Sequence, residues 1–226
     1  MIQKIGHRGA KGFIAENTLE SFQKALDLGV DAVELDVHLC ASGELVVFHD
    51  FTIDRMTNGS GEVHKLTLTE LKALKISGRF EMPTLAEVFD LIDRKCWINV
   101  ELKGHQTAET SVAVIEKYIN EKGWQYDDFV VSSFQKDELE RVYTLNPKIN
   151  LGILTQASVE QALEWADQLS AKAIHPHFSL LTEENCNKAI LKGYQIFTWT
   201  VNHETDIQRL QHYKINGIIS DFPDRL

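Results

Sequence analysis

Apolar and polar residues follow two different periods along this chain. Short apolar runs of the kind that form strands lie at residues 3–7, 31–37, 96–103, 128–134, 149–155, 171–177, 194–201 and 216–221. Segments with a 3.6-residue period predict helices at residues 18–29, 84–94, 107–123, 135–145, 159–169, 182–193 and 203–214. This alternation predicts a parallel sheet with right-handed crossovers. Eight such units in 226 residues favour an α/β fold of the (β/α)8 TIM-barrel type, with an open doubly wound sheet as the alternative.

One part of the chain interrupts this alternation. After the second strand, SGELVVFHD at residues 42–50 predicts another short strand behind a Ser-Gly turn. Residues 51–82 then lack a clear period, apart from a short helix predicted at 67–74. We interpret 51–82 as a small insertion after the second barrel strand, within a single TIM-barrel domain of residues 1–226. In TIM barrels the loops at this end of the strands carry the active site.

Local signals mark the ends of several predicted helices. Asn17 followed by Glu20 predicts a capping box at the start of the first helix. Gly123 and Gly193 predict the C-terminal ends of two later helices.

The composition narrows the classes of partner. A formal net charge of −10 disfavours nucleic acid, which needs a basic face, but allows a small phosphorylated ligand held by a few cations. The wide spacing of the cysteines predicts reduced thiols rather than a disulfide framework or a zinc site. No apolar run has transmembrane length, and MIQKIGHRG lacks the apolar segment of a signal peptide. We therefore expect a cytoplasmic protein without stable membrane insertion; its oligomeric state stays unknown. The three cysteines are Cys40, Cys96 and Cys186.

Carboxylates occupy every second position of a strand that is otherwise apolar. In AVELDVH, Glu34 and Asp36 share one face of the strand with His38. The later strand VELK repeats the pattern with Glu101 and Lys103. Burying these groups is costly unless they are paired or hold a metal ion. Three carboxylates would suit Mg²⁺, Ca²⁺ or Mn²⁺. The alternative is a pair of buried ion pairs, Glu34 with Lys103 and Asp36 with Arg8.

Two histidines lie at predicted strand ends beside other polar groups. His7 sits in GHRG, where Arg8 is able to hold an anionic oxygen, and His49 ends the apolar run LVVFHD. Two histidines that titrate near neutrality are able to divide general-base and general-acid roles. We assign the other seven to structure or solvent, and among these His38 is the least settled because it shares the face of the carboxylates. They are His38, His64, His105, His175, His177, His203 and His212.

The order of these motifs resembles that of the glycerophosphodiester phosphodiesterases, of the compact bacterial type. The stretch IGHRGAKGFIAENTLESFQKALDLGVDAVELDVHLCASGELVVFHD is similar to the family's N-terminal signature. PTLAEVF, VELK, SSF, TWTVN and GIISDFPD follow in the family's order, so the resemblance covers essentially the whole chain. One departure is Ala15 in AENT, where the family usually has proline, which changes loop stiffness but no chemical group.

The resemblance implies a role for each matching residue. The two carboxylates of the ELD motif and the later glutamate would bind one divalent cation, Mg²⁺ or Ca²⁺, with Mn²⁺ also possible. The two histidines would act as acid and base, and the arginine and lysine would hold the phosphate. Trp199 would line the site near the glycerol, and Phe13 would form part of its wall. The matching residues are His7, Arg8, Glu34, Asp36, His49, Glu101 and Lys103.

The reaction implied is metal-dependent hydrolysis of a glycerophosphodiester, such as glycerophosphocholine or glycerophosphoethanolamine, to glycerol 3-phosphate and an alcohol. The nucleophile is either the neighbouring glycerol hydroxyl or water. The sequence does not assign base and acid between His7 and His49, although we favour His49 as the base. A phosphodiesterase for lysophospholipids or phosphoinositides is the alternative, for which residues 51–82 offer only a modest apolar rim. A non-catalytic phosphoglycerol-binding barrel is less favoured, because it would be expected to have lost one of the polar residues.

Overall fold

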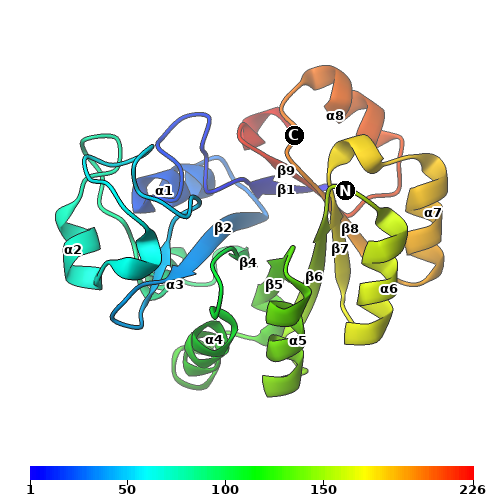
Figure 1. The fold of residues 1–226 in the computed structure, drawn as a ribbon. Helices are drawn as coiled ribbons and strands as arrows, with labels where there is room; N and C mark the ends of the chain where they lie inside the picture. Colours follow the sequence, from blue (N-terminus) through cyan, green and yellow to red (C-terminus); the bar gives the residue numbers. More distant parts are fainter.

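A closed parallel barrel forms the centre of the computed structural model, which describes all of residues 1–226 (Figure 1). The strand order is β1-β9-β8-β7-β6-β5-β4-β2-β3, and an additional pairing of β1 with β2 closes the ring. Every barrel pairing is parallel, which confirms the predicted (β/α)8 TIM barrel. The barrel strands are β1 (Gln3–Gly6), β2 (Ala32–Leu39), β4 (Trp97–Leu102), β5 (Phe129–Ser133), β6 (Asn150–Thr155), β7 (Ala173–Pro176), β8 (Gln195–Thr198) and β9 (Gly217–Ser220).

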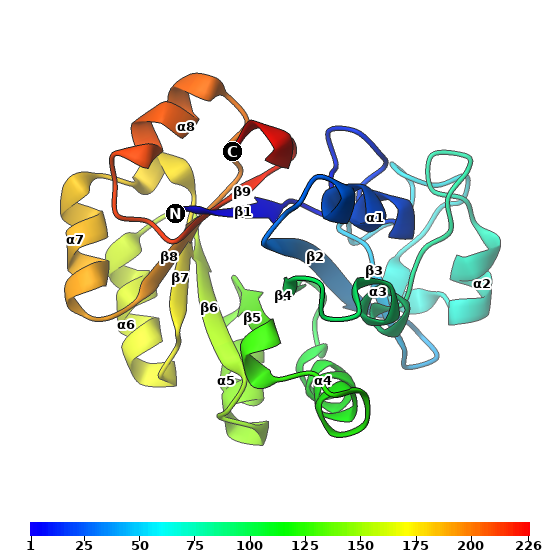
Figure 2. The same ribbon diagram turned by 180° about the vertical axis from the view of Figure 1, so that it is seen from behind.

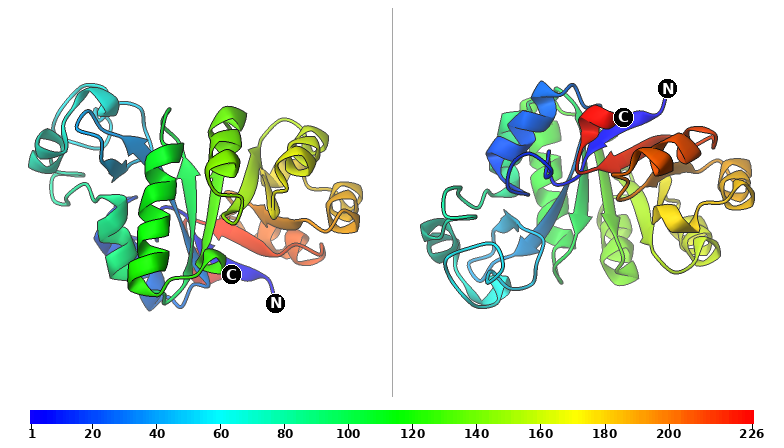
Figure 3. Two further views of the ribbon diagram at one scale, coloured as in Figure 1. Left: turned by 90° about the horizontal axis from the view of Figure 1, so that it is seen from below. Right: turned by 90° about the horizontal axis from the view of Figure 1, so that it is seen from above.

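Except for α2, the helices pack along the outside of these strands, as the view from behind and the two turned views show (Figures 2 and 3). Each begins and ends within a few residues of its predicted limits, because its apolar face and its end signals agree. They are α1 (Leu19–Asp27), α2 (Leu68–Ala73), α3 (Leu85–Ile92), α4 (Ala108–Lys122), α5 (Lys136–Leu145), α6 (Val159–Leu169), α7 (Glu183–Leu191) and α8 (Glu204–Gln211). Short 3₁₀ helices span Val63–Lys65, Tyr126–Asp128, Phe178–Leu180 and Pro223–Arg225.

The first helix begins one residue later than the predicted capping box requires. Thr18 is its N-cap, and the hydroxyl of Thr18 accepts a hydrogen bond from the Ser21 amide. Asn17 instead adopts a left-handed backbone with φ of 56°, and its side-chain amide donates to Asp36 at 2.9 Å. The predicted role of Asn17 as helix cap is therefore wrong, because its side chain reaches into the barrel.

Between β2 and α3 the chain leaves the strand–helix alternation. The strand β3 (Leu45–Val47) pairs antiparallel with β2, and residues 51–82 follow it with α2, isolated bridges and irregular turns. This segment lies beside β2 and α1 in both Figures 1 and 2. It has its own small apolar cluster, in which Ile53 and Leu71 are buried.

The barrel interior changes from apolar to polar toward the ends of the strands. A small apolar cluster with Ile5, Ala32 and Phe197 fills the interior. A much larger core lies between the strands and the surrounding helices. The inward-facing positions nearer the C-terminal ends of β2 and β4 carry carboxylates instead, so the polar residues collect at one mouth. None of the helices combines the length and the apolar composition that a membrane-spanning helix needs.

Candidate active site

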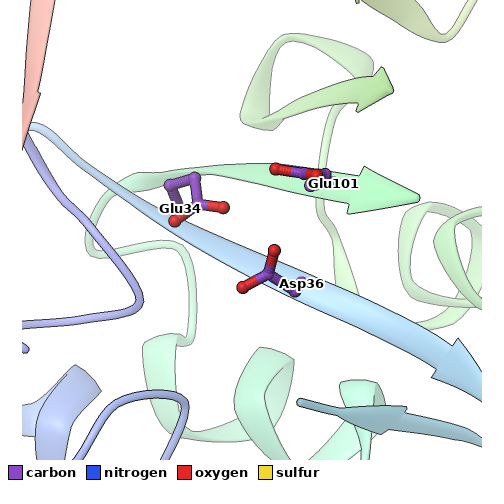
Figure 4. A group of neighbouring side chains, drawn as sticks. All are labelled: Glu34, Asp36 and Glu101. Atoms are coloured by element: carbon purple, nitrogen blue, oxygen red, sulfur yellow. The ribbon is translucent and has the colours of Figure 1, made fainter. Parts of the chain in front are cut away.

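Three buried carboxylates meet inside the barrel mouth, on the neighbouring strands β2 and β4 (Figure 4). The parallel register places Asp36 opposite Glu101 and Glu34 opposite Asn99. One ligand oxygen from each of Glu34, Asp36 and Glu101 lies within 4.8 Å of the others, although each residue is at most 8% exposed.

Because the three carboxylates are buried close together, ionising them costs free energy unless a positive charge compensates. Burial and the repulsion from Asp36 raise the pKa of Glu101 to about 7. Burial and the repulsion from Asp36 and Glu101 raise the pKa of Glu34 well above its usual value. A divalent cation would relieve both effects, and an all-carboxylate donor set suits a hard cation. The residues present therefore fit a divalent metal site.

Two cations border the acidic cluster. The backbone amide of Arg8 donates to Glu34 at 2.9 Å, and the Arg8 guanidinium Nε lies 3.3 Å from Asp36. Lys103 Nζ lies 3.0 Å from Glu101, and this neighbour raises the pKa of Lys103 despite its burial. The ion pair of Asp36 with Arg8 that the sequence left open is thus present, whereas Lys103 contacts Glu101 rather than Glu34.

His7 follows β1 and is oriented by a residue from the opposite end of the chain. Its Nδ1 lies 2.5 Å from Asp221, which follows β9. Because an ionised carboxylate only accepts hydrogen bonds, Nδ1 carries the proton and Nε2 is left for other contacts. Nε2 lies 3.9 Å from Glu34, and burial lowers the pKa of His7. Asn202 donates to the second oxygen of Asp221 at 2.9 Å and so holds it in place.

His49 follows β3 and has a similar arrangement. Its Nδ1 lies 2.6 Å from Asp50, the next residue, and burial lowers the pKa of His49. The ring nitrogen Nε2 of His38 lies 3.1 Å from the backbone carbonyl of His49. Donation from His38 to this carbonyl anchors the chain next to the imidazole of His49, which gives His38 a supporting contact.

A cavity of about 330 Å³ brings most of the predicted site residues together. Trp199 forms one wall, where its indole N–H donates to the carbonyl of His175 at 2.7 Å and its ring meets Phe134 edge to face. Phe13 does not line this cavity; it is 47% exposed and packs against Phe222. The lining residues with polar side chains are His7, Arg8, Glu34, His49, Asn99, Glu101, Lys103, Gln156, Trp199 and Thr200.

Several residues that support the site were given no role from the sequence. Asp221 lies 214 positions from His7, and no local pattern connects the two. Asp50 is adjacent to His49, so the His-Asp dipeptide could have indicated that Asp50 orients the imidazole. Asn99 Oδ1, Ser132 Oγ and both ring nitrogens of His175 are also buried without a hydrogen-bond partner. Only Asn99 of these three lines the cavity.

Fold and site together define a class of protein: a TIM-barrel hydrolase whose carboxylates, histidines and cations suit a phosphate ester. Residues 7–225 match the model of the glycerophosphoryl diester phosphodiesterase family. A glycerophosphodiester phosphodiesterase of Caldanaerobacter subterraneus subsp. tengcongensis is 36% identical, over 98% of this chain and 95% of its own length. The structure of an Oleispira antarctica phosphodiesterase, in complex with the product sn-glycerol-3-phosphate, superposes with a TM-score of 0.90 at 30% identity. That match covers 99% of this chain and 94% of the other.

The chain belongs to the glycerophosphoryl diester phosphodiesterase family, and it is an enzyme of that activity. A second relative, from Bacillus altitudinis, is 34% identical over all of this chain and 96% of its own length.

Proposed function

We propose that this enzyme hydrolyses small glycerophosphodiesters, such as glycerophosphocholine or glycerophosphoethanolamine, to glycerol 3-phosphate and an alcohol, with Mg²⁺ or Ca²⁺ as cofactor. The observation that carries the proposal is one cavity of about 330 Å³ lined by two carboxylates, two histidines and two cations, with the third carboxylate, Asp36, directly beside Glu34 and Glu101. The glycerol 3-phosphate bound by the Oleispira antarctica relative supports the same product here.

Glu34, Asp36 and Glu101 would hold the cation, which when bound neutralises phosphate charge and orients the glycerol unit. Arg8 and Lys103 would contact the non-bridging phosphate oxygens and stabilise the charge that grows on them in the transition state. Both are positioned by the cluster itself, through the contacts of Arg8 with Glu34 and Asp36 and of Lys103 with Glu101. Trp199 would face the glycerol as an apolar wall.

His7 and His49 would divide the proton transfers. Each binds a carboxylate through Nδ1, which leaves Nε2 for the substrate, and burial lowers the pKa of both imidazoles. We assign His49 as the base that accepts the proton of the glycerol 2-hydroxyl while its oxygen attacks phosphorus. His7 would then protonate the departing alcohol oxygen as its bond to phosphorus breaks. Water opens the resulting cyclic phosphate to give glycerol 3-phosphate, with the two histidines in exchanged roles.

The surroundings of the cavity favour a water-soluble substrate over a lysophospholipid. The adjoining apolar hollow, which shares Phe134 and Leu154 with the cavity, has a volume of only about 110 Å³. An acyl chain would remain largely in solvent there, which makes lipid binding less favourable.

Purified enzyme should be incubated with glycerophosphocholine, glycerophosphoethanolamine and lysophosphatidylcholine, with Mg²⁺, with Ca²⁺ or with EDTA, while glycerol 3-phosphate release is measured. We expect release from the two soluble diesters, and loss of it in EDTA. Preference for the lysolipid would contradict the substrate class, and activity that survives both EDTA and His7→Ala would contradict the chemistry.

A separate variant tests the role assigned to His49. His49→Ala should lower turnover by about two to four decades, the usual worth of general acid–base catalysis, while diester binding largely survives. His212→Ala is the matched control, because His212 is exposed at the end of α8 and does not line the cavity. Equal turnover of the His49 variant and the control would show that His49 transfers no proton.

A further inference from the structure

One arginine of the segment 51–82 lies behind the cavity rather than in it. Arg55 is absent from the cavity lining, and its side chain is 51% exposed. Its backbone position is fixed by neighbours on both sides: Ile53 is buried in the small apolar cluster, and the carbonyl of Met56 accepts from the Ser77 amide at 2.7 Å. The guanidinium is thus presented from a packed part of the segment.

The Arg55 guanidinium contacts two carboxylates at once. Nε donates to Asp50 Oδ2 at 2.5 Å and Nη2 donates to Asp50 Oδ1 at 2.9 Å, which is a bidentate pair. Nη2 also donates to Glu16 Oε1 at 2.7 Å. The remaining nitrogen, Nη1, lies 3.1 Å from Met56 Sδ. No other side chain of the protein bridges Asp50 and Glu16.

Each of these carboxylates holds a residue that the proposed function uses. Asp50 Oδ1 lies 2.6 Å from His49 Nδ1, so the oxygen that orients the imidazole also accepts from Arg55. Glu16 Oε1 accepts from Arg8 Nη1 at 2.8 Å, so one oxygen of Glu16 joins the two guanidinium groups. A continuous chain of hydrogen bonds therefore runs from His49 through Asp50, Arg55 and Glu16 to Arg8.

Burial and charge distinguish this hydrogen-bond network from an isolated surface ion pair. Glu16 is only 5% exposed, and its pKa is lowered to about 2 against the effect of burial, by the bond from Arg55 and by Arg8. The bonds from Arg55 likewise hold the pKa of Asp50 below its usual value. An isolated exposed pair contributes little, whereas a bidentate pair within a network fixes side-chain orientation as well.

We propose that Arg55 is a positioning residue, which orients the His49 imidazole through Asp50 and the phosphate-binding Arg8 through Glu16. The proposal rests on the roles given to His49 and Arg8 under the proposed function. Arg55 touches no substrate. Through Asp50 it keeps Nδ1 of His49 in a hydrogen bond, so that Nε2 faces the reacting atoms. Through Glu16 it fixes the position of the Arg8 guanidinium in the cavity wall. The segment 51–82 thereby completes the active site that the barrel strands begin.

The test is a double-mutant cycle between Arg55 and His49, with kcat and KM for glycerophosphocholine as readouts in saturating Mg²⁺. Arg55→Ala should lower kcat by about tenfold to a hundredfold, as loss of a supporting partner does elsewhere. In the His49→Ala background the same substitution should lower kcat by clearly less than it does in the wild type, because no imidazole remains to be oriented and only the support of Arg8 through Glu16 is still lost. Arg55→Lys should recover only part of the loss, since an ammonium cannot form the bidentate pair.

Arg79→Ala is the matched control, because Arg79 lies in the same segment, is exposed and stacks on Phe80 without an ion pair; its kcat should equal that of the wild type. Should the alanine variant fail to fold, Arg55→Gln, which keeps the aliphatic stem as far as Cδ and a polar end group, replaces it in the same cycle. The proposal is overturned if the fold losses in kcat from the Arg55 and His49 substitutions simply multiply in the double variant. A wild-type kcat in Arg55→Ala would overturn it too. If His49→Ala alone kept full turnover, the proposed function would fail as well, and the two failures are distinguished by that single variant.

Discussion

Glu101→Gln should stabilise the cation-free protein at alkaline pH, although it removes a proposed metal ligand. Burial and the neighbouring Asp36 raise the pKa of Glu101 from 4.5 to about 7, and its side chain is only 11% exposed. The folded protein thus holds this proton more tightly than the unfolded chain. The resulting penalty on folding is absent below pH 4.5, grows as the pH rises, and is complete above about 7.

The size of the stabilisation follows from the difference between the pKa values of Glu101 in the folded and unfolded states. At 1.36 kcal/mol per pKa unit, the ionised Glu101 destabilises the folded state by ~3 kcal/mol. Glutamine resembles the protonated acid and avoids the penalty. For a chain of this length, ~3 kcal/mol corresponds to a rise in Tm of roughly 6 to 12 °C.

Thermal unfolding in EDTA at pH 8 and at pH 4.5 measures this directly. We expect Glu101→Gln to melt above the wild type at pH 8 and level with it at pH 4.5. Saturating Mg²⁺ or Ca²⁺ at pH 8 should raise the Tm of the wild type and have less effect on the variant, because the wild type has the full ligand set. Glu121→Gln, an exposed position on α4, is the control and should change nothing. A variant that melts below the wild type in EDTA at pH 8 would refute the reasoning.

Two further substitutions test the support of His7 and the core. Asp221→Asn should lower kcat on the order of a hundredfold with a smaller change in KM, because it removes a charge-assisted bond that fixes the imidazole of His7, and steady-state kinetics measure it; unchanged kcat would exclude an orienting role for Asp221. Phe89→Ala should lower the free energy of unfolding by ~3–5 kcal/mol, since the fully buried ring packs against Tyr118, Trp124 and Phe129. Urea titration checks this, and a loss below about 1 kcal/mol would mean that the aromatic cluster closes around the cavity.

The barrel and the acidic cluster were predictable from local patterns. The eight strands are short and mostly apolar, and the helices between them carry clear amphipathic periods. The order of strands and helices can therefore be predicted without knowing which strands pair. The two-residue period of AVELDVH places Glu34 and Asp36 on one face, and the same period in VELK places Glu101 beside them. Parallel strands bring their C-terminal ends to one mouth, which is why Glu101 joins residues almost seventy positions away.

Contacts that depend on side-chain direction between distant elements were not predictable. Asp221 meets His7 only because closure of the ring makes β9 the neighbour of β1. The alternative ion pair of Lys103 with Glu34 does not form, because the side chain of Lys103 turns toward Glu101 on its own strand. Asn17 has the sequence signal of a helix cap, yet tertiary contact with Asp36 prevails over the local preference. Arg55 lies in a segment without any period, so nothing in the sequence connects it with Asp50 and Glu16.

A crystal of the enzyme with Mn²⁺ and glycerol 3-phosphate tests the central claim most directly, because the anomalous signal of Mn²⁺ locates the ion independently of the protein. The account predicts a single strong peak among the carboxylates of Glu34, Asp36 and Glu101, with the phosphate between Arg8 and Lys103. An ion bound at other residues, or a phosphate held outside this cavity, would contradict it.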